Sequence, residues 1–159
     1  MSYREYSRPY KEWHGTELAE NMRQVDIDEV YASSGHNPLQ AILSSVELSD
    51  ENFTFLHESK VVAIAGIREV NENSAVPWML CSNALEDFKK DHKKTFYKCT
   101  KQWVDDMNER YQMLFNYVDA RNEVTIRWLK HLKFEFPKLI EDYGFEKIPF
   151  YLFMRVRHV

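Results

Sequence analysis

Cysteine and glycine are both scarce in this sequence of 159 residues, which contains two cysteines and four glycines. Cys81 and Cys99 lie in apolar segments and lack the CxxC or Cys/His spacing of a zinc site. We therefore expect two reduced thiols in the core of a cytoplasmic protein. The six histidines are scattered without an HxH or HExxH pair, so the sequence gives no support for a metal centre.

Long hydrophobic runs are absent too. No apolar stretch approaches the roughly 18 residues that a membrane span requires. The start, "MSYREYSRPYKEW", is charged and aromatic, unlike a signal peptide. The formal net charge of -4 and the pI near 5.9 show no overall basic character that would favour nucleic acid. We expect a soluble chain with no membrane span and without nucleic acid as a partner.

The length suits one domain over residues 1–159, with residues 1–12 forming an edge strand or an arm. The first third reads as helices. Thr16 is a suitable N-cap, Gly35 suits a left-handed helix end, and Asn37 followed by Pro38 marks another helix start. Apolar spacing predicts that these residues point inward: Leu18, Met22, Val25, Ile27, Val30, Tyr31, Leu39, Ile42, Leu43 and Val46.

The pattern changes to strands after residue 52. Two β-rich runs joined at Glu58–Lys60 predict a hairpin, and residues 71–74 predict a turn before a third strand, "AVPWMLCS". Because Pro77 has no amide hydrogen, it belongs at that strand's start or on an unpaired edge. Residues 83–111 have helical spacing with a break expected near Lys90–His92.

The last third alternates strand, helix and strand. Val118 closes a buried strand, a helix follows Asn122, and "FEF" is a short strand. We predict a loop over residues 137–149 and a final strand from Phe150. The fold class is therefore α/β (α+β), with a mixed and mostly antiparallel sheet flanked by helices.

This order of elements resembles the GNAT acetyltransferase fold. Members carry V-x-x-x-N-x-x-A/S-x-x-F/L-Y-x-x-x-G-F, and the chain matches at positions that include Val118, Asn122 and Phe134. The resemblance implies acetyl-CoA as the cofactor. Where the family has a tyrosine that protonates the departing thiolate, the chain has Leu129, which donates no proton, and where the family has glycine it has Lys133.

The larger departure concerns the diphosphate of coenzyme A. GNAT proteins bind it with a loop of the form Q/R-x-x-G-x-G/A, because bare backbone amides at a helix start must approach the phosphates closely. Here the matching "NALEDFKKDHKK" has no glycine, and Glu86 and Asp87 add negative charge. Ser82, Asn83 and Asn122 are candidate cofactor contacts, whereas Lys89, Lys90 and Lys93 either contact phosphates or form a solvated helix face.

Single residues allow two interpretations. Asn122 either caps the following helix or contacts a cofactor. The three tryptophans at positions 78, 103 and 128 read as core residues that can border a cleft, and Tyr117 reads as a packing residue. Glu69, Asp119 and His57 are general-base candidates that no spacing singles out. The catalytic residues therefore stay unknown.

From about Val61 to the end, the chain also resembles small GNAT-like proteins of short-tailed phages, of the internal virion protein A type. The match runs through "PWMLCSNAL", "LFNYVDARN", "IRWLK" and "FYLF", and the lost tyrosine is usual in that group. This resemblance implies a phage protein in the host bacterial cytoplasm or the virion, with phage virion or assembly proteins as partners.

Three functions follow as hypotheses. The first is a non-enzymatic protein of virion assembly without a cofactor. The second is a divergent acyltransferase that uses acetyl-CoA. The third is an inhibitor that binds a host protein.

Overall fold

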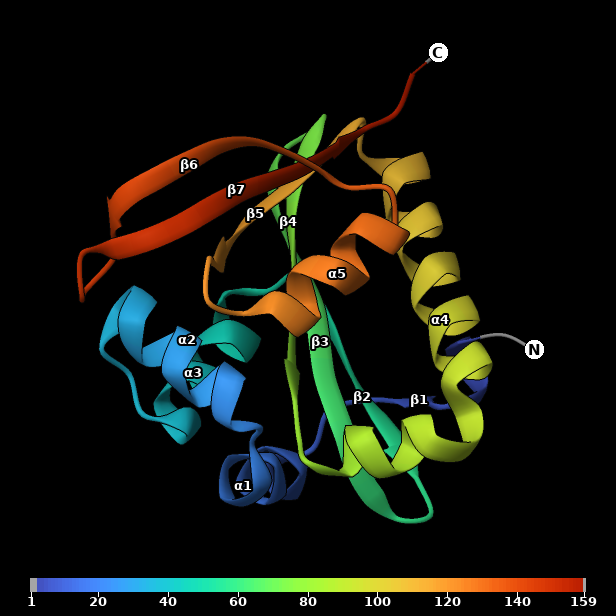
Figure 1. The fold of residues 1–159 in the computed structure, drawn as a ribbon. Coiled ribbons are helices and arrows are strands. Elements are labelled where there is room, and N and C mark those ends of the chain that lie inside the picture. Colours follow the sequence, from blue (N-terminus) through green and yellow to red (C-terminus); the bar gives the residue numbers. More distant parts are fainter. Residues whose placement is uncertain (1–2, 159) are drawn as a thin grey trace.

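The computed structural model describes residues 3–158, which form a sheet of seven strands in the order β1-β2-β3-β4-β5-β7-β6. Figure 1 shows the sheet with helices on both faces. The strands are β1 (Ser7–Arg8), β2 (Glu51–His57), β3 (Lys60–Asn71), β4 (Ser74–Cys81), β5 (Met113–Asp119), β6 (Glu135–Tyr143) and β7 (Ile148–Val156). The helices are α1 (Glu12–Asn21), α2 (Gln24–Ser34), α3 (Pro38–Leu48), α4 (Ala84–Arg110) and α5 (Glu123–His131). The mixed α+β architecture predicted from the sequence is confirmed.

Among the strands of the described chain, the β4–β5 pair is parallel and the others are antiparallel. A two-residue turn joins β2 to β3, where Glu58 and Ser59 have φ angles of 50° and 65°. Two successive positive φ values characterise the type I′ turn, whose twist matches that of the strands. The predicted hairpin is therefore confirmed. β1 pairs with β2 at the sheet edge through Ser7 and Arg8.

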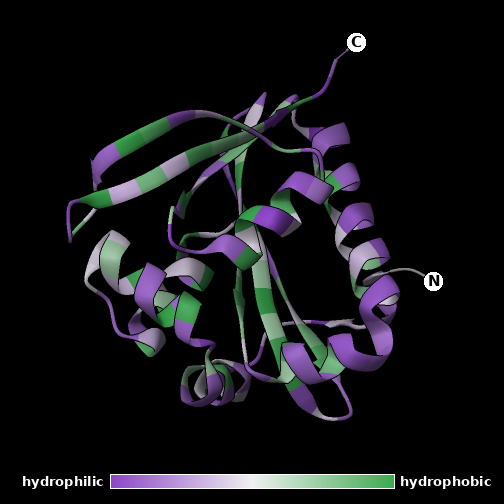
Figure 2. Ribbon diagram, viewed as in Figure 1, coloured by the Kyte–Doolittle hydropathy of each residue, from purple (hydrophilic) through white to green (hydrophobic). Residues whose placement is uncertain are grey.

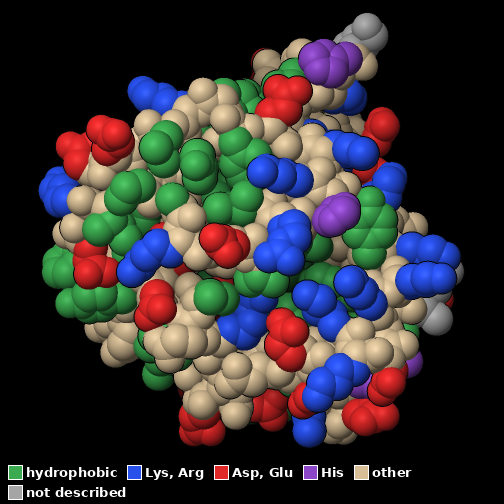
Figure 3. Space-filling model, in the orientation of Figure 1, with side chains coloured by type: hydrophobic (Ala, Val, Ile, Leu, Met, Phe, Trp, Pro, Cys, Tyr) green, Lys and Arg blue, Asp and Glu red, His purple; other side chains and the backbone are tan. Residues whose placement is uncertain are grey.

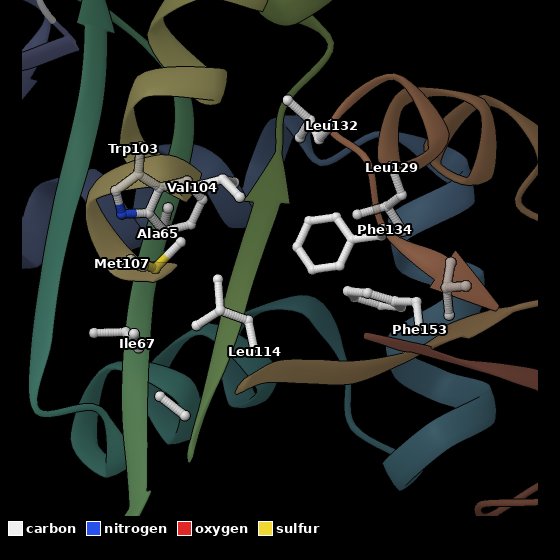
Figure 4. Close-up of a cluster of buried hydrophobic side chains, with 12 residues drawn as sticks. Ala65, Ile67, Trp103, Val104, Met107, Leu114, Leu129, Leu132, Phe134 and Phe153 are labelled. Carbon is white, nitrogen blue, oxygen red and sulfur yellow. The ribbon is translucent and has the colours of Figure 1, made fainter. Parts of the chain in front are cut away.

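The two faces of the sheet carry different helices. The first three helices cover one face around Leu18, Ile42 and Ile64, whereas α4 and α5 cover the other. Figure 2 shows hydrophobic residues concentrated in the sheet and hydrophilic residues along α4. In Figure 4, side chains from α4, α5 and the strands meet in one cluster, with Trp103 and Phe153 among them. Within residues 3–158, no helix is both long enough and apolar enough to cross a membrane.

Local signals located several helix ends correctly. Gly35 ends α2 with a φ of 75°. Asn37 caps α3, and its side chain accepts a hydrogen bond from Gln40 N at 2.9 Å. His92, with φ -129° and ψ 30°, interrupts α4 within the predicted break. Both cysteines are buried free thiols.

The start predicted for the first helix was wrong. α1 begins at Glu12, so Thr16 lies inside the helix and caps nothing. The side chain that caps this helix belongs to His14, whose Nδ1 accepts a hydrogen bond from Lys11 N at 2.9 Å. His14 is buried and also contacts Thr54 of β2. Because histidine is not among the usual capping residues, capping preferences did not locate this helix start.

Two further expectations were wrong. Leu39 and Leu43 are 41% and 48% exposed, because α3 packs through Ala41 and Ile42 instead. Tyr31 of α2, expected to point inward as well, is 47% exposed. The loop expected over residues 137–149 is mostly strand, since β6 continues to Tyr143. β6 lies at the edge of the sheet, where a strand pairs on one side and tolerates proline and charge. Its sequence therefore lacks the apolar run typical of a central strand.

Candidate functional site

β4 and β5 run side by side briefly and then diverge. Their parallel pairing ends at Ala75 and Leu114. Just beyond, Asn116 Nδ2 donates a hydrogen bond to the Pro77 carbonyl oxygen at 2.8 Å. Because the amide nitrogen and carbonyl of one strand residue point to the same edge, Pro77 faces the gap, where its missing N–H leaves no donor unpaired. Pro77 thus lies inside β4, on the unpaired edge that we predicted, and not at its start.

The gap opens into a cavity of about 190 Å³ between the sheet, α2 and α5. Most of its walls are aromatic or aliphatic. Tyr117 and Tyr143 stack with ring centroids 4.8 Å apart on one side. The three tryptophans that we expected in the core or at a cleft all line this cavity: Trp78, Trp103 and Trp128.

The tip of the β6–β7 hairpin is hydrogen-bonded to the end of α2 beside this cavity. Phe145 N donates to the Ser33 carbonyl at 3.1 Å, and Glu146 N donates to the Ala32 carbonyl at 3.0 Å. Gly144 has a φ of 74°, and a Cβ there would lie 2.7 Å from the Ala32 oxygen. The hairpin therefore needs glycine at this position to approach α2.

Glu29 of α2 is the acidic residue among those that line this cavity. It lines the cavity, and its Oε1 accepts hydrogen bonds from Asp119 N at 2.9 Å and from Asn122 Nδ2 at 3.3 Å. Burial raises the pKa of Glu29 to about 8, although both hydrogen bonds favour the ionised form. A carboxyl with such a pKa can exchange a proton near neutral pH. Sequence reasoning missed Glu29, because a single glutamate on a helix resembles an ordinary surface residue.

The turn between β5 and α5 is filled by groups of the protein itself. Asn122 Oδ1 accepts a hydrogen bond from Thr125 N at 3.2 Å, which caps α5, while its Nδ2 reaches Glu29. Asp119 is buried and forms an ion pair with Arg121 at 2.7 Å. Both ends of the Asn122 side chain are therefore bonded within the protein, and the Asp119 carboxylate already has a cation.

The corner between β4 and α4 is where the sequence motif would bind a diphosphate. Five consecutive amides there donate hydrogen bonds inside the protein. The pairs are Ser82 N to Val62 O (3.0 Å), Asn83 N to Asn21 O (2.8 Å), Ala84 N to Ser82 Oγ (3.1 Å), Leu85 N to Ser82 O (3.1 Å) and Glu86 N to Asn83 O (3.2 Å). Ser82 Oγ in turn donates to the Val61 carbonyl. This corner offers no free backbone donor, so it does not fit a diphosphate.

The neighbouring polar groups are also paired. Arg23 makes two hydrogen bonds to the Asp26 carboxylate, and Asp26 Oδ2 accepts from Cys81 N at 2.8 Å. Burial raises the pKa of the Cys81 thiol to about 12. Since the thiolate is the nucleophilic form, Cys81 is inert at neutral pH.

The three lysines that we considered as phosphate contacts lie in different surroundings. Lys89 is half-buried in a narrow groove with Arg23 and Trp128, and its Nζ lies 6.0 Å from the Phe96 ring centroid. Lys90 pairs with Asp87 at 3.4 Å on the surface. Lys93 is exposed. The fold thus brings one of the three to the groove.

The other general-base candidates lie elsewhere. His57 packs on His92, with ring centroids 5.1 Å apart. Glu69 lies in the exposed C-terminal part of β3. Neither residue lines the cavity or the groove. Within the described part of the chain, no three His, Cys, Asp or Glu side chains gather as a metal site would require.

Solved structures that share this fold include proteins described as acetyltransferases. Ard1 from Thermoplasma volcanium matches with a TM-score of 0.72 and 14% identity, over 96% of this chain and 97% of that one. A ribosomal-protein-alanine N-acetyltransferase from Brucella melitensis matches with a TM-score of 0.66 and 12% identity, over 95% and 99%. RimL, a ribosomal L7/L12 alpha-N-protein acetyltransferase solved with coenzyme A, matches with 0.66 and 8%, over 94% and 92%. At these identities the likeness shows the GNAT fold alone.

Sequence comparison points to phages. No curated protein matches the chain. A sequence model of the family described as "Bacteriophage T7, probable scaffold protein Gp13" matches residues 51–143, which include β2 to β6. This span is more than half of the 159 residues. The chain therefore belongs to the phage T7 Gp13 family of probable scaffold proteins, and it adopts a GNAT fold.

Proposed function

We propose that the protein is not an enzyme and that it acts in virion assembly or as a minor internal component of the particle. It would be made in the cytoplasm of the bacterial host, with other phage proteins as its partners. Membership of a scaffold-protein family supports this role.

The observation that carries the proposal is the closed corner after β4. A diphosphate at a helix start binds to amides whose hydrogens are free. Here the amides of residues 82–86 already donate to protein acceptors, and the exposed carboxylates of Glu86 and Asp87 lie in the first turn. Each displaced hydrogen bond would cost about 0.5–1.5 kcal/mol, and the carboxylates would add repulsion. Coenzyme A would have to overcome all of these costs together.

Calorimetry with acetyl-CoA tests this proposal. We expect no binding heat with the full-length protein under conditions in which a GNAT acetyltransferase, as positive control, gives a clear isotherm. A thiol-release assay over a set of amines should stay at the level of the buffer. Micromolar binding of acetyl-CoA together with acetyl transfer would overturn the proposal.

Phage complementation tests the role itself. A phage that lacks this gene should regain plaques when the wild-type protein or the Glu29→Gln variant is supplied from a plasmid. The glutamine keeps an oxygen that accepts from Asp119 N but carries no proton to exchange. If only the wild-type protein restores plaques, proton exchange by Glu29 is needed and a purely structural role is wrong.

One observation favours a second candidate, a divergent acyl-CoA-dependent N-acyltransferase. Glu29 has a pKa of about 8 and lines an apolar cavity, as a general base would. In this candidate Lys89, Lys90 and Lys93 would hold the phosphates in place of the amides. Thiol release that disappears in Glu29→Gln but persists in Glu47→Gln, an exposed site on α3, would establish it.

A further inference from the structure

Positive charge is concentrated on two neighbouring elements. Residues 84–98 and 123–133 contain eight Lys and Arg against four Asp and Glu, whereas the rest of the chain contains 13 against 21. These two segments thus carry +4 in a protein whose formal charge is -4. Figure 3 shows blue side chains gathered over α5 and the N-terminal half of α4.

The two elements are joined along a seam of aromatic contacts. Phe96 stacks on Trp128 with centroids 6.0 Å apart, and Tyr97 Oη donates to the His131 carbonyl at 3.0 Å. Lys93 lies one turn before Tyr97, and Arg127 lies one turn before His131. Lys93 and Arg127 therefore flank the same seam from opposite sides.

We define the cationic face as Lys89, Lys93, Lys94, Arg127, Lys130 and Lys133. Five of the six side chains are exposed, and Lys89 is half-buried. Among the described residues, none of the six takes part in an ion pair, although Lys90 and Lys101 on the same helix both do. The cationic face therefore keeps charge that the protein itself leaves uncompensated.

The groove beside this face is lined by both apolar and charged side chains. Leu85, Phe96, Val124 and Trp128 supply apolar surface, and Lys89 lines it together with Arg23, Asp26 and Glu29. An occupant that matches both features carries carboxylates next to an apolar side chain. A polyphosphate matches less well, because it has no apolar group to place against Leu85, Phe96, Val124 and Trp128.

We propose that the cationic face, together with this groove, docks an acidic segment of a partner protein that inserts an apolar side chain between α4 and α5. This proposal rests on the assembly role proposed above and adds the chemistry of the partner. Charge complementarity of this kind accelerates association and selects the partner.

Fluorescence anisotropy with defined probes tests the proposal. The probe is the labelled peptide EELFEE, and its control is QQLFQQ. We expect the full-length protein to bind the acidic peptide, more weakly as salt rises from about 50 mM to about 300 mM, and not to bind the control. Amide NMR shifts should concentrate at residues 85–97 and 124–131.

A matched pair of triple variants supplies the specificity control. Lys89→Glu/Lys93→Glu/Arg127→Glu should weaken peptide binding by about tenfold to hundredfold. Lys60→Glu/Arg68→Glu/Lys138→Glu makes the same change in net charge at exposed sites elsewhere and should leave binding within about twofold. Equal losses in both triples, equal binding of both peptides, or tighter binding of a duplex DNA of about 20 base pairs would each overturn the proposal.

The acetyl-CoA titration separates this inference from the proposed function. If neither the peptide nor acetyl-CoA binds, the docking face is rejected and the non-enzymatic role is retained. If the protein turns over acetyl-CoA and the peptide also binds to the cationic face, the non-enzymatic role is rejected and the docking face is retained.

Discussion

Replacement of Glu29 by glutamine should stabilise the protein, and by an amount that depends on pH. The folded protein holds the Glu29 proton up to a pKa of about 8, whereas the ordinary glutamate pKa of 4.5 describes the unfolded chain. Between these two values the folded state binds more protons than the unfolded state, so the wild-type free energy of unfolding falls as pH rises. The loss reaches about 3 kcal/mol at pH 7 and about 5 kcal/mol above pH 8.

The glutamine variant avoids this loss because it has no charge to bury, and its oxygen can accept the same two hydrogen bonds from Asp119 N and Asn122 Nδ2. Urea unfolding of both proteins should give equal stabilities near pH 4, where both side chains are neutral. At pH 7 the variant should be more stable by about 3 kcal/mol. Glu47→Gln, at an exposed position on α3, is the control and should change stability little at either pH.

The opposite outcome is informative. A Glu29→Gln variant that is less stable than wild type at pH 7, or a difference that stays constant with pH, would mean that Glu29 is ionised in the folded protein.

Three other substitutions test the site. Asn122→Ala should cost about 1–2 kcal/mol in urea unfolding, because it removes the cap of α5, and an unchanged stability would show that this cap contributes nothing. Leu129→Tyr, which restores the family's usual residue, should cost about 1–3 kcal/mol, because Leu129 is 4% exposed and packed; thiol release in this variant would show that the lost tyrosine was all that activity lacked. Gly144→Ala should lower the melting temperature, because its Cβ would meet the Ala32 carbonyl and its φ is positive; an unchanged melting temperature would show that the hairpin tip contributes nothing to stability.

Some parts of the fold follow from local chemistry. Asn37 followed by Pro38 starts a helix, because both the cap and the fixed φ act within one turn. The hairpin at Glu58 likewise arises within a few residues. Such features survive in any tertiary context that tolerates them, so sequence reasoning found them.

Other parts depend on neighbours that are distant in sequence. Leu39 and Leu43 looked like core residues, but the side of α3 that meets α1 and β3 decides which residues are buried. The length of β6 depends on its position at the sheet edge, since an edge strand needs apolar residues less than a central one.

The sequence by itself determined the α+β class, the order of the elements and the absence of glycine after β4, because periodicity and residue type suffice for these. The tertiary structure alone decided that the amides of residues 82–86 donate hydrogen bonds within the protein and that Glu29 lies beside Asp119 and Asn122. Hydrogen-bond acceptors such as Asn21 and Val62 come from other elements, and the pKa of Glu29 depends on burial that only packing creates.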